Sequence, residues 1–451
     1  MRLFKIFCLI YSMLQLTTIA SNAQYYFKHY QTNDGLSHNS VRSIMQDKKG
    51  FIWVGTRSGL NRFDGYTFKA YKNISDHIGY FGKDIFTFLF DDNNGMIWVG
   101  TGRGVFKFNP ISETFTKLKS VKGFIDHLVV DQKNNIWIIA DNKILQYQQG
   151  LKKTRSYLIS ASCMAIDSNQ NIWFGNNYGV ISKLNPFTQK VTKIVNRTSN
   201  DKLQSISAIY PIANDQVLIG YFKKGLKILD AKQQLIKDLP LNTDKNLEIF
   251  VRDIKPGNGQ NYLIGTESGL YIYDLATHKS INLKKQIGDP YALSDNAVYT
   301  VCRDNNDGIW VGTFFGGINY YSRENARFKK YYPIPNTNSI SGNAVREITA
   351  DKQGNLWIGT EDAGINKLNL STQKFTTYTS ADKKRGLSYP NIHGLLVWGN
   401  NLFIGPFFHG LEIMDIKKGV VTDRFRYIGE KGDSLSDFIL SLYLSKDSTL
   451  Y

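Results

Sequence analysis

One short phrase recurs along the sequence, and this repeat restricts the possible folds more than any other feature. Six of the seven tryptophans stand two or, in one copy, three residues before the small residue, usually glycine, that ends a short apolar run. The phrase recurs three more times with another residue in place of tryptophan. The nine copies are IWVGT at 52–56, IWVGT at 97–101, IWIIA at 136–140, IWFGN at 172–176, LIG at 218–220, LIG at 263–265, IWVGT at 309–313, LWIGT at 356–360 and FIG at 403–405.

The copies follow one another at a nearly constant interval. From Gly55 to Gly405, the small-residue slot advances by 45, 40, 35, 45, 45, 47, 47 and 46 residues. Intervals of this size are typical of propeller blades and solenoid repeats.

The first copy, at 40–72, indicates which of these repeats the chain forms. Apolar segments at 41–46, 51–56, 60–63 and 67–71 are separated by the turn sequences DKKG, RSG and DG. Glycine accepts a positive φ, so these turns indicate tight hairpins. Four short antiparallel strands without helical periodicity are typical of a propeller blade. We therefore predict an all-β fold, a seven-bladed β-propeller followed by an incomplete second β-propeller.

The tryptophans are expected to pack between neighbouring blades, because the wedge between two sheets widens away from the axis and a large ring fills it. An aspartate stands six residues before the tryptophan slot in six copies, and its side chain suits the backbone amides of the turn. The alternative is a calcium site, since turns such as DDNNG are rich in oxygen, but DKKG and DKQG carry few carboxylates. The six are Asp47, Asp92, Asp131, Asp167, Asp304 and Asp351.

Residues 1–23 have the pattern of a secretory signal peptide. A basic start precedes a mostly apolar stretch at 6–16, and Ser21 and Ala23 supply the small residues of a cleavage site. A membrane anchor is the alternative, although the apolar stretch is shorter than the roughly 20 residues that span a bilayer. We expect export to the periplasm.

The composition indicates a globular chain without specialised chemistry. Hydrophobic residues make up 42% and charged residues 21%, which argues against disorder. After removal of the signal, 53 basic residues against 38 acidic ones suit an acidic polymer or simply serve solubility. The basic residues form no cluster or nucleic-acid module, so no nucleic-acid partner is expected. Cys163 and Cys302 lack metal spacing and are expected to be buried, unpaired thiols; no cofactor is expected.

The two ends of the first ring are expected to meet in one sheet. An aromatic segment at 26–30 precedes the first copy, and a similar segment at 328–332 follows the copy around Trp310. The first segment is expected to be the outer strand of the seventh blade, which removes an open edge. The second would then close another ring. The predicted organisation is a signal peptide at 1–23, a seven-bladed propeller at 24–325 and the start of a second propeller at 326–451.

The second propeller is expected to contain two and a half blades. A tenth copy begins at 435–437, and its aromatic slot aligns with Tyr451. Such a partial ring leaves an edge and an apolar face uncovered. We therefore expect the sequence to be the first part of a longer protein.

The repeat D-x-x-G-x-[IL]-W-[VI]-G-T, followed by G-[LI]-N-x-[FYL], resembles the two-component regulator propeller repeat. The segment at 27–71 is similar to the usual start of periplasmic sensors in hybrid two-component systems of glycan-degrading Gram-negative bacteria. The resemblance covers nearly all of 25–451. It implies two seven-bladed propellers, an immunoglobulin-like domain, an inner-membrane span, a histidine kinase, a receiver and a DNA-binding module. This sequence carries none of the kinase or regulator parts.

A ligand is expected on one face of the ring, where the hairpins between strands two and three lie beside the connections from strand four to the next strand one. Aromatic rings next to charged groups suit sugars, which stack through apolar faces and bind through hydroxyls. The basic members favour an acidic or sulfated glycan, although exposed hairpin tips are often simply charged. The candidate ligand-binding residues are Arg57, Arg103, Tyr178, Tyr221, Phe222, Lys223, Glu267, Phe314 and Phe315.

Three classes of function fit this face. The first is a non-enzymatic periplasmic sensor that binds a glycan-derived oligosaccharide and so shifts the arrangement of its two rings or of a homodimer. The second is an extracytoplasmic protein-interaction scaffold. The third is a propeller enzyme such as a lyase, which the scattered histidines and the lack of a nucleophile motif disfavour.

Overall fold

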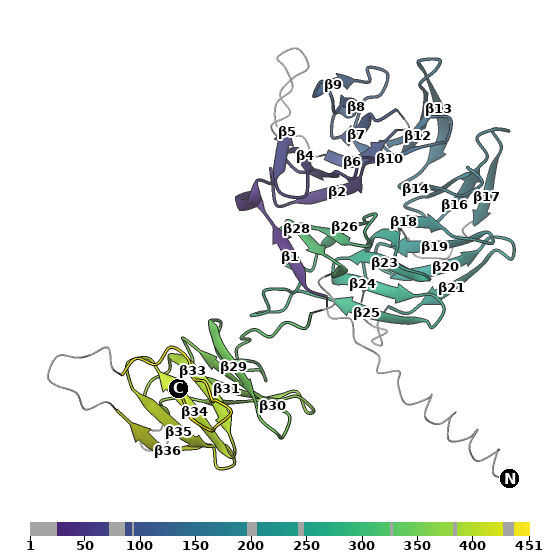
Figure 1. Cartoon of the computed structure of the whole chain (residues 1–451). Helices are drawn as coiled ribbons and strands as arrows, with labels where there is room; N and C mark the ends of the chain where they lie inside the picture. The colour runs from purple at the N-terminus through teal and green to yellow at the C-terminus, as the bar shows by residue number, and fades with distance from the viewer. Residues whose placement is uncertain are drawn as a thin grey trace, which may run out of the picture. The chain divides into compact units, whose positions relative to one another are not determined.

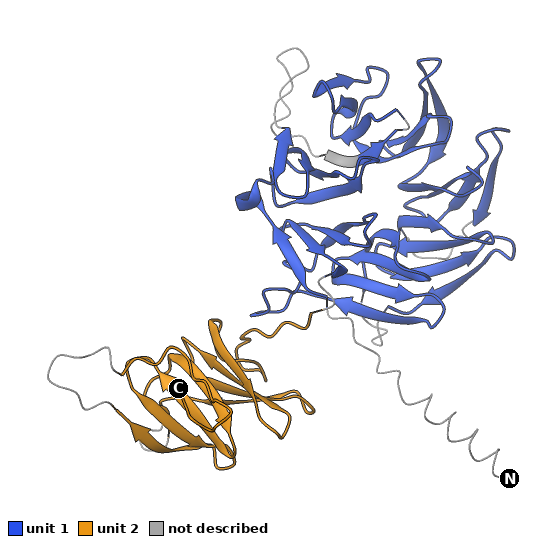
Figure 2. Ribbon diagram, in the orientation of Figure 1, with its two compact units in different colours: residues 1–327 blue, residues 328–451 orange. Residues whose placement is uncertain are grey.

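The computed structural model describes residues 25–71, 86–92, 94–195, 205–241, 248–324, 328–381, 386–426 and 437–451, and the predicted signal peptide lies outside them. The chain divides into two compact units, Met1–Arg327 and Phe328–Tyr451 (Figure 2). The described residues form strands and turns with one short 3-10 helix, Thr32–Asp34, which confirms the all-β prediction. No helix in these ranges is both long and apolar enough to cross a membrane.

In the described residues, the first unit contains seven four-stranded antiparallel sheets (Figure 1). Six sheets take their strands in chain order, and the seventh joins β1 to β26–β28. The strands of the first three sheets are β2 (Val41–Gln46), β3 (Ile52–Thr56), β4 (Gly59–Phe63), β5 (Phe68–Tyr71), β6 (Phe86–Asp91), β7 (Ile97–Thr101), β8 (Gly104–Asn109), β9 (Thr114–Lys117), β10 (Ile125–Val130), β11 (Ile136–Ala140), β12 (Lys143–Gln148) and β13 (Lys153–Ser160). Those of the other four are β14 (Cys163–Ile166), β15 (Ile172–Gly175), β16 (Ile181–Leu184), β17 (Val191–Val195), β18 (Ile206–Pro211), β19 (Gln216–Tyr221), β20 (Leu226–Asp230), β21 (Leu235–Leu239), β22 (Val251–Pro256), β23 (Asn261–Thr266), β24 (Gly269–Asp274), β25 (Lys279–Leu283), β26 (Val298–Arg303), β27 (Ile309–Thr313), β28 (Ile318–Tyr321) and β1 (Phe27–Tyr30).

The first strands of these seven sheets form a closed ring. Each packs against the first strand of the next sheet, and β26 of the seventh sheet packs against β2 of the first. The outer strand of the seventh sheet is β1, with Phe27 opposite Tyr321 and Tyr30 opposite Ile318. The predicted closing strand at 26–30 is therefore confirmed. Its pairing covers the edge of β28 that would otherwise be free to pair with another chain.

The repeated glycine is explained by the close approach of neighbouring sheets. A Cβ added to Gly175 would lie 2.6 Å from Cγ2 of Ile206, which begins the inner strand of the next sheet. At the closure of the ring, a Cβ on Gly312 would lie 2.5 Å from Cγ1 of Val41. Real side chains do not approach so closely, so the slot requires a residue without a side chain or a shift of the next strand.

The tryptophans are buried between sheets, as predicted, and each forms a hydrogen bond that the repeat pattern alone did not suggest. Trp53 is fully buried, and its Nε1 donates to Oδ2 of Asp47 at 2.8 Å. The other oxygen of Asp47 accepts the backbone N–H groups of Lys49 and Phe51. All six copies that carry the pair contain the indole–carboxylate bond. The aspartate therefore fixes both its turn and its tryptophan.

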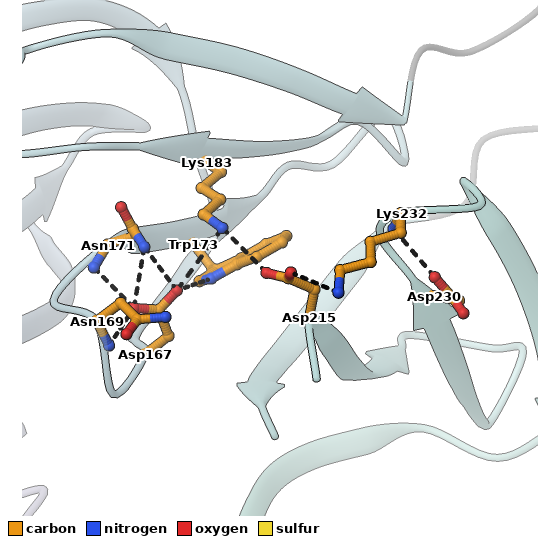
Figure 3. A network of polar contacts seen from close by, with 8 residues as sticks. All are labelled: Asp167, Asn169, Asn171, Trp173, Lys183, Asp215, Asp230 and Lys232. Atoms are coloured by element: carbon orange, nitrogen blue, oxygen red, sulfur yellow. Dashed lines mark hydrogen bonds and ion pairs between the residues drawn. The ribbon is translucent and has the colours of Figure 1, made fainter. Parts of the chain in front are cut away.

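A basic side chain extends this network to the next sheet (Figure 3). Lys183 lies 4.8 Å from the centre of the Trp173 ring and 4.0 Å from the carboxylate of Asp167. The same ammonium group lies 3.3 Å from Asp215, in the turn of the neighbouring sheet. The fourth and fifth sheets are thus joined by both ring packing and charge.

The second unit, in its described residues, contains two four-stranded sheets. Ile348, on the first inner strand, is 57% exposed, whereas the equivalent Ile44 of the first unit is 6% exposed. Further along, the backbones of Tyr443 and Tyr451 pair with each other around a turn. The strands are β29 (Val345–Ala350), β30 (Asn355–Thr360), β31 (Ile365–Asn369), β32 (Lys374–Tyr378), β33 (Ile392–Trp398), β34 (Asn401–Pro406), β35 (Leu411–Asp415) and β36 (Val420–Phe425).

Two sequence expectations need correction. The segment at 328–332 forms no strand, because each third strand in the described part of this unit is already paired with a fourth strand of its own sheet. Cys163 is buried as predicted, but Cys302 is only partly buried, and both thiols are free. Burial raises the pKa of Cys163 to about 12.

Candidate ligand-binding site

The inner strands of the first unit surround a central channel with a cavity of about 370 Å³. Side chains from the strands β2, β6, β10, β14, β18, β22 and β26 all line it. The channel is therefore a property of the whole ring and not of any one sheet.

A β-bulge near the start of the inner strand turns one extra side chain into this channel. In six of the seven sheets the pairing of the first two strands shifts by one residue at the same place, as between Val41 and Ser43 in β2. A bulge of this kind re-aims a side chain and often lies beside a functional site. The bulge residues that line the cavity are Arg42, Asp126, Ser207, Arg252 and Tyr299.

Each bulge residue is matched by the residue fifteen positions later, on the hairpin between strands two and three. The bulge and the hairpin lie on the same face of the ring, since a backbone N–H of the hairpin donates to the residue before the inner strand. In the seventh sheet, for example, Phe314 N donates to Ala297 O at 3.0 Å. Tyr299 stacks on Phe314 with ring centres 5.1 Å apart, and Arg252 donates to Glu267 at 2.7 Å. We call such a couple a bulge–hairpin pair.

Three of these side chains form an arginine–tyrosine cluster at the mouth of the channel. The guanidinium carbon of Arg42 lies 4.5 Å from the centre of the Tyr299 ring, and that of Arg252 lies 4.8 Å from the same ring. Guanidinium groups stack favourably on aromatic faces. The Tyr299 ring thus holds two cations, Arg42 and Arg252, beside the cavity.

The predicted hairpin residues divide into two groups around this cluster. Phe314 contacts Tyr299 and lies 5.1 Å from the Arg42 guanidinium carbon, while Phe222 lies 5.6 Å from that of Arg252. Glu267 pairs with Arg252, and Phe315 packs on Phe314 with ring centres 4.3 Å apart.

The other predicted residues lie at the edge of this group or outside it. Lys223 forms an ion pair with Glu248 at 3.3 Å, beside the same group of rings. Arg57 is exposed on the β3–β4 hairpin, close enough to lower the pKa of Arg42. Arg103 and Tyr178 lie on the β7–β8 and β15–β16 hairpins, which belong to the second and fourth sheets.

Tyr221 requires a correction. Only 2% of its surface is exposed, and burial raises its pKa to about 12. The side chain belongs to the core between the fourth and fifth sheets, because it is the last residue of β19 and points inward there. It cannot present its ring on the hairpin surface.

Deeper in the channel, charged side chains lie close to one another. The Lys255 ammonium group lies 3.5 Å from Asp253, whose carboxylate keeps the pKa of the lysine raised. Asp253 also accepts a hydrogen bond from Val301 N at 3.0 Å. Burial raises the pKa of Asp126. Burial, with a smaller contribution from the positive charge of Lys255, lowers the pKa of His127 to about 3. The histidine is therefore neutral at pH 7.

The turn aspartates have no free oxygen directed at a cation. Both oxygens of Asp131, for example, accept N–H groups, from Lys133 and Asn135 on one side and Trp137 on the other. Within the described ranges, no three His, Cys, Asp or Glu side chains are grouped as metal ligands. The observed role of these aspartates is the turn role that the sequence favoured.

Sequence reasoning missed Arg42, Arg252 and Tyr299, because it considered only hairpin tips. The signal was present: the residue after the first apolar position of the six bulged inner strands varies among Arg, Thr, Asp, Ser and Tyr. Strict alternation would assign that position to one face of a sheet. Only the bulge turns it toward the axis.

Comparison with known proteins gives one matching family model, described as two component regulator propeller, at residues 35–58, 292–315 and 339–362. A relative, histidine kinase P4 of Formosa agariphila, is 51% identical over 65 residues. That match covers 14% of this chain and 5% of the kinase.

Solved structures share the fold. The extracellular domain of BT3049 from B. thetaiotaomicron, classed as a hybrid two-component system, matches with a TM-score of 0.65 and 20% identity. That of BT4673 matches with a TM-score of 0.57 and 16% identity. Each match covers 95% of this chain but 64% of the solved structure, so the chain spans less than two thirds of these neighbours.

Virginiamycin B lyase from Staphylococcus aureus matches over 66% of this chain and 99% of the lyase, with a TM-score of 0.51 and 12% identity. That likeness has a lower TM-score and, like the other two, concerns the fold alone. The family model, in contrast, matches the repeat sequence itself in both units. The sequence likeness at these three segments is therefore to the regulator propeller repeat.

Proposed function

We propose that this chain, whose repeats match the two component regulator propeller model, is the extracytoplasmic sensing region of a hybrid two-component system and binds a glycan-derived oligosaccharide. The proposed organisation is a signal peptide at 1–23, a propeller at 24–325 and the start of a second propeller at 326–451. Binding would change the arrangement of the rings or of a homodimer, and so regulate a histidine kinase module.

One observation carries this proposal: aromatic and cationic side chains from bulges and hairpins converge at the mouth of a channel of about 370 Å³. Phe315 is 73% exposed there, next to the partly buried Phe314. Rings of this kind stack on the apolar faces of sugars, while arginine and glutamate groups bind hydroxyls or acidic substituents. The cavity volume is in the range of small-molecule sites.

The binding proposal is tested by isothermal titration calorimetry of the full chain against neutral, uronic and sulfated oligosaccharides. Phe314→Ala should weaken the binding of a responding oligosaccharide about tenfold, equivalent to about 1.4 kcal/mol. Tyr178→Ala is the matched control, because it removes an exposed hairpin ring outside the cluster. Equal affinities of the wild type and both variants would place the site elsewhere.

The alternative function, a protein-interaction scaffold, would use the same face. It would be favoured by the absence of any calorimetric response together with a stable protein partner recovered by the wild type but not by Phe315→Ala. Export is tested separately by sequencing the N-terminus of the secreted protein, which should begin at Gln24.

A further inference from the structure

The bulge–hairpin pair of the first sheet differs from its equivalents in charge. In the sixth sheet Arg252 faces Glu267, and in the second unit the equivalent Arg346 lies 3.4 Å from Glu361. In the first sheet the same two positions are Arg42 and Arg57. The glutamate that neutralises the bulge arginine elsewhere is thus replaced by a second cation.

Arg42 has one buried donor without an acceptor. Its Nε is buried and has no hydrogen-bond partner, and the described residues give Arg42 no ion pair. Burial is the main cause that lowers the pKa of Arg42; Tyr299 opposes this shift, and the positive charges of Arg252 and Arg57 add to it. The protein places this charge where its own surroundings disfavour it.

The carboxylates that line the same channel do not neutralise the charge of Arg42. Asp253 is occupied by Lys255 and by the N–H of Val301, and Glu267 is occupied by Arg252. Asp126 lines the cavity from another sheet, where burial and Asp141 raise its pKa and so disfavour its charged form. An anion from outside would therefore be the counter-charge.

We infer that Arg42 and Arg57 form an anion subsite at the channel mouth, which binds a carboxylate or sulfate group of the ligand. The inference rests on the proposed function for its biological meaning and deepens it by naming the group that is recognised. The planar guanidinium of Arg42, held on Tyr299, offers its remaining N–H donors in the fork that suits such oxyanions. Arg57 supplies the second charge from the hairpin.

The subsite is tested without any sugar, by thermal unfolding of the full chain in sodium sulfate or sodium acetate against sodium chloride of equal ionic strength. A bound anion stabilises the folded state in proportion to its occupancy. Sulfate also stabilises proteins through exclusion from their surface, but this effect is common to all variants. The measured quantity is therefore the difference between the wild type and each variant.

Arg42→Gln should weaken the specific anion response at least tenfold. Arg57→Glu should abolish it and raise the melting temperature without added anion, because it restores the arginine–glutamate pair of the other sheets. Arg346→Gln is the matched control, since it removes the same charge from the same bulge position in the second unit, and should leave the response unchanged.

A response to either anion that depends on Arg42 supports the subsite, and a response to sulfate alone assigns it to sulfate esters. Equal responses of the wild type, Arg42→Gln and Arg57→Glu would overturn it. This result is independent of the oligosaccharide titration, which can fail while the anion response persists. Arg57→Glu also controls for folding, because it is expected to be more stable than the wild type.

Discussion

Each turn aspartate acts on two parts of its repeat, which explains why the residue recurs with tryptophan. In the first sheet, Oδ1 of Asp47 holds the turn through two backbone N–H groups and Oδ2 accepts the indole N–H of Trp53 at 2.8 Å. An asparagine would keep the turn bonds but present a donor to the indole. The repeat therefore requires a carboxylate at this position.

Asp47→Asn should lower the free energy of unfolding by about 1–3 kcal/mol, because it leaves the buried indole N–H of Trp53 without an acceptor. Urea unfolding measures the change. Asp64→Asn is the control: Asp64 accepts two turn amides at the surface and bonds no indole, so its replacement should be nearly neutral. Equal losses for both variants would contradict the role assigned to the indole bond.

The repeated glycine gives a second prediction about a single residue. Gly312→Ala should destabilise the protein by about 1–3 kcal/mol, because the new Cβ meets Val41 at 2.5 Å across the ring closure. The added Val41→Ala should recover part of the loss, and a double-mutant cycle measures this coupling. Gly150→Ala, where a Cβ meets nothing within 4 Å, is the control. Purely additive effects would show that the two positions do not touch.

At the level of elements, the bulge–hairpin pair is the unit that varies while the sheets stay constant. Tyr299 with Phe314 is an aromatic pair, Arg252 with Glu267 an ion pair, and Arg42 with Arg57 a pair of like charge. Each pair changes the channel mouth without changing the core. The charge and aromatic character of the channel mouth can therefore change while the sheets stay the same.

The strand β1 joins the ends of the ring through its side chains as well as its backbone. Tyr30 is 7% exposed, and its ring centre lies 5.2 Å from that of Phe63 and 6.2 Å from that of Trp310. Tyr30→Ala should cost about 3–5 kcal/mol in urea unfolding, as large aromatic truncations do. Tyr66→Ala, at a site that is 91% exposed, should change stability by less than about 0.5 kcal/mol. A small loss for Tyr30→Ala would mean that β1 is held by backbone pairing alone.

For the first unit as a whole, closure of the ring produces a channel whose charges no single sheet contains. His127, from the third sheet, faces Lys255, from the sixth, and this environment makes its folded pKa about 3. The unfolded chain binds a proton on this histidine near pH 6.5, whereas the folded chain binds it near pH 3. Its contribution to stability is therefore lost as the pH falls from 6.5 to 3.

His127→Gln should reduce the pH dependence of the unfolding free energy in this window, by at most about 1.4 kcal/mol per pH unit. Urea unfolding of both proteins at pH 7 and pH 4.5 measures it. The same loss of stability in both proteins would show that the histidine is not the group that titrates.

The sequence by itself determined the sheets and their order. The spacing of the tryptophan phrase, the turn residues and the unpaired segment at 26–30 predicted the four-stranded sheets and the strand that closes the first ring, because these depend on local turn chemistry and hydrophobic period. It also predicted that the tryptophans are buried. These features lie within one repeat or between neighbouring repeats.

Only the tertiary structure decided which residues share the channel mouth. Arg42 and Tyr299 come from opposite ends of the first unit's sequence and meet because the ring closes, and both face the channel because of a bulge that alternation does not reveal. A period of two cannot place such residues, since their direction depends on a local shift of register and on sheets distant in the chain.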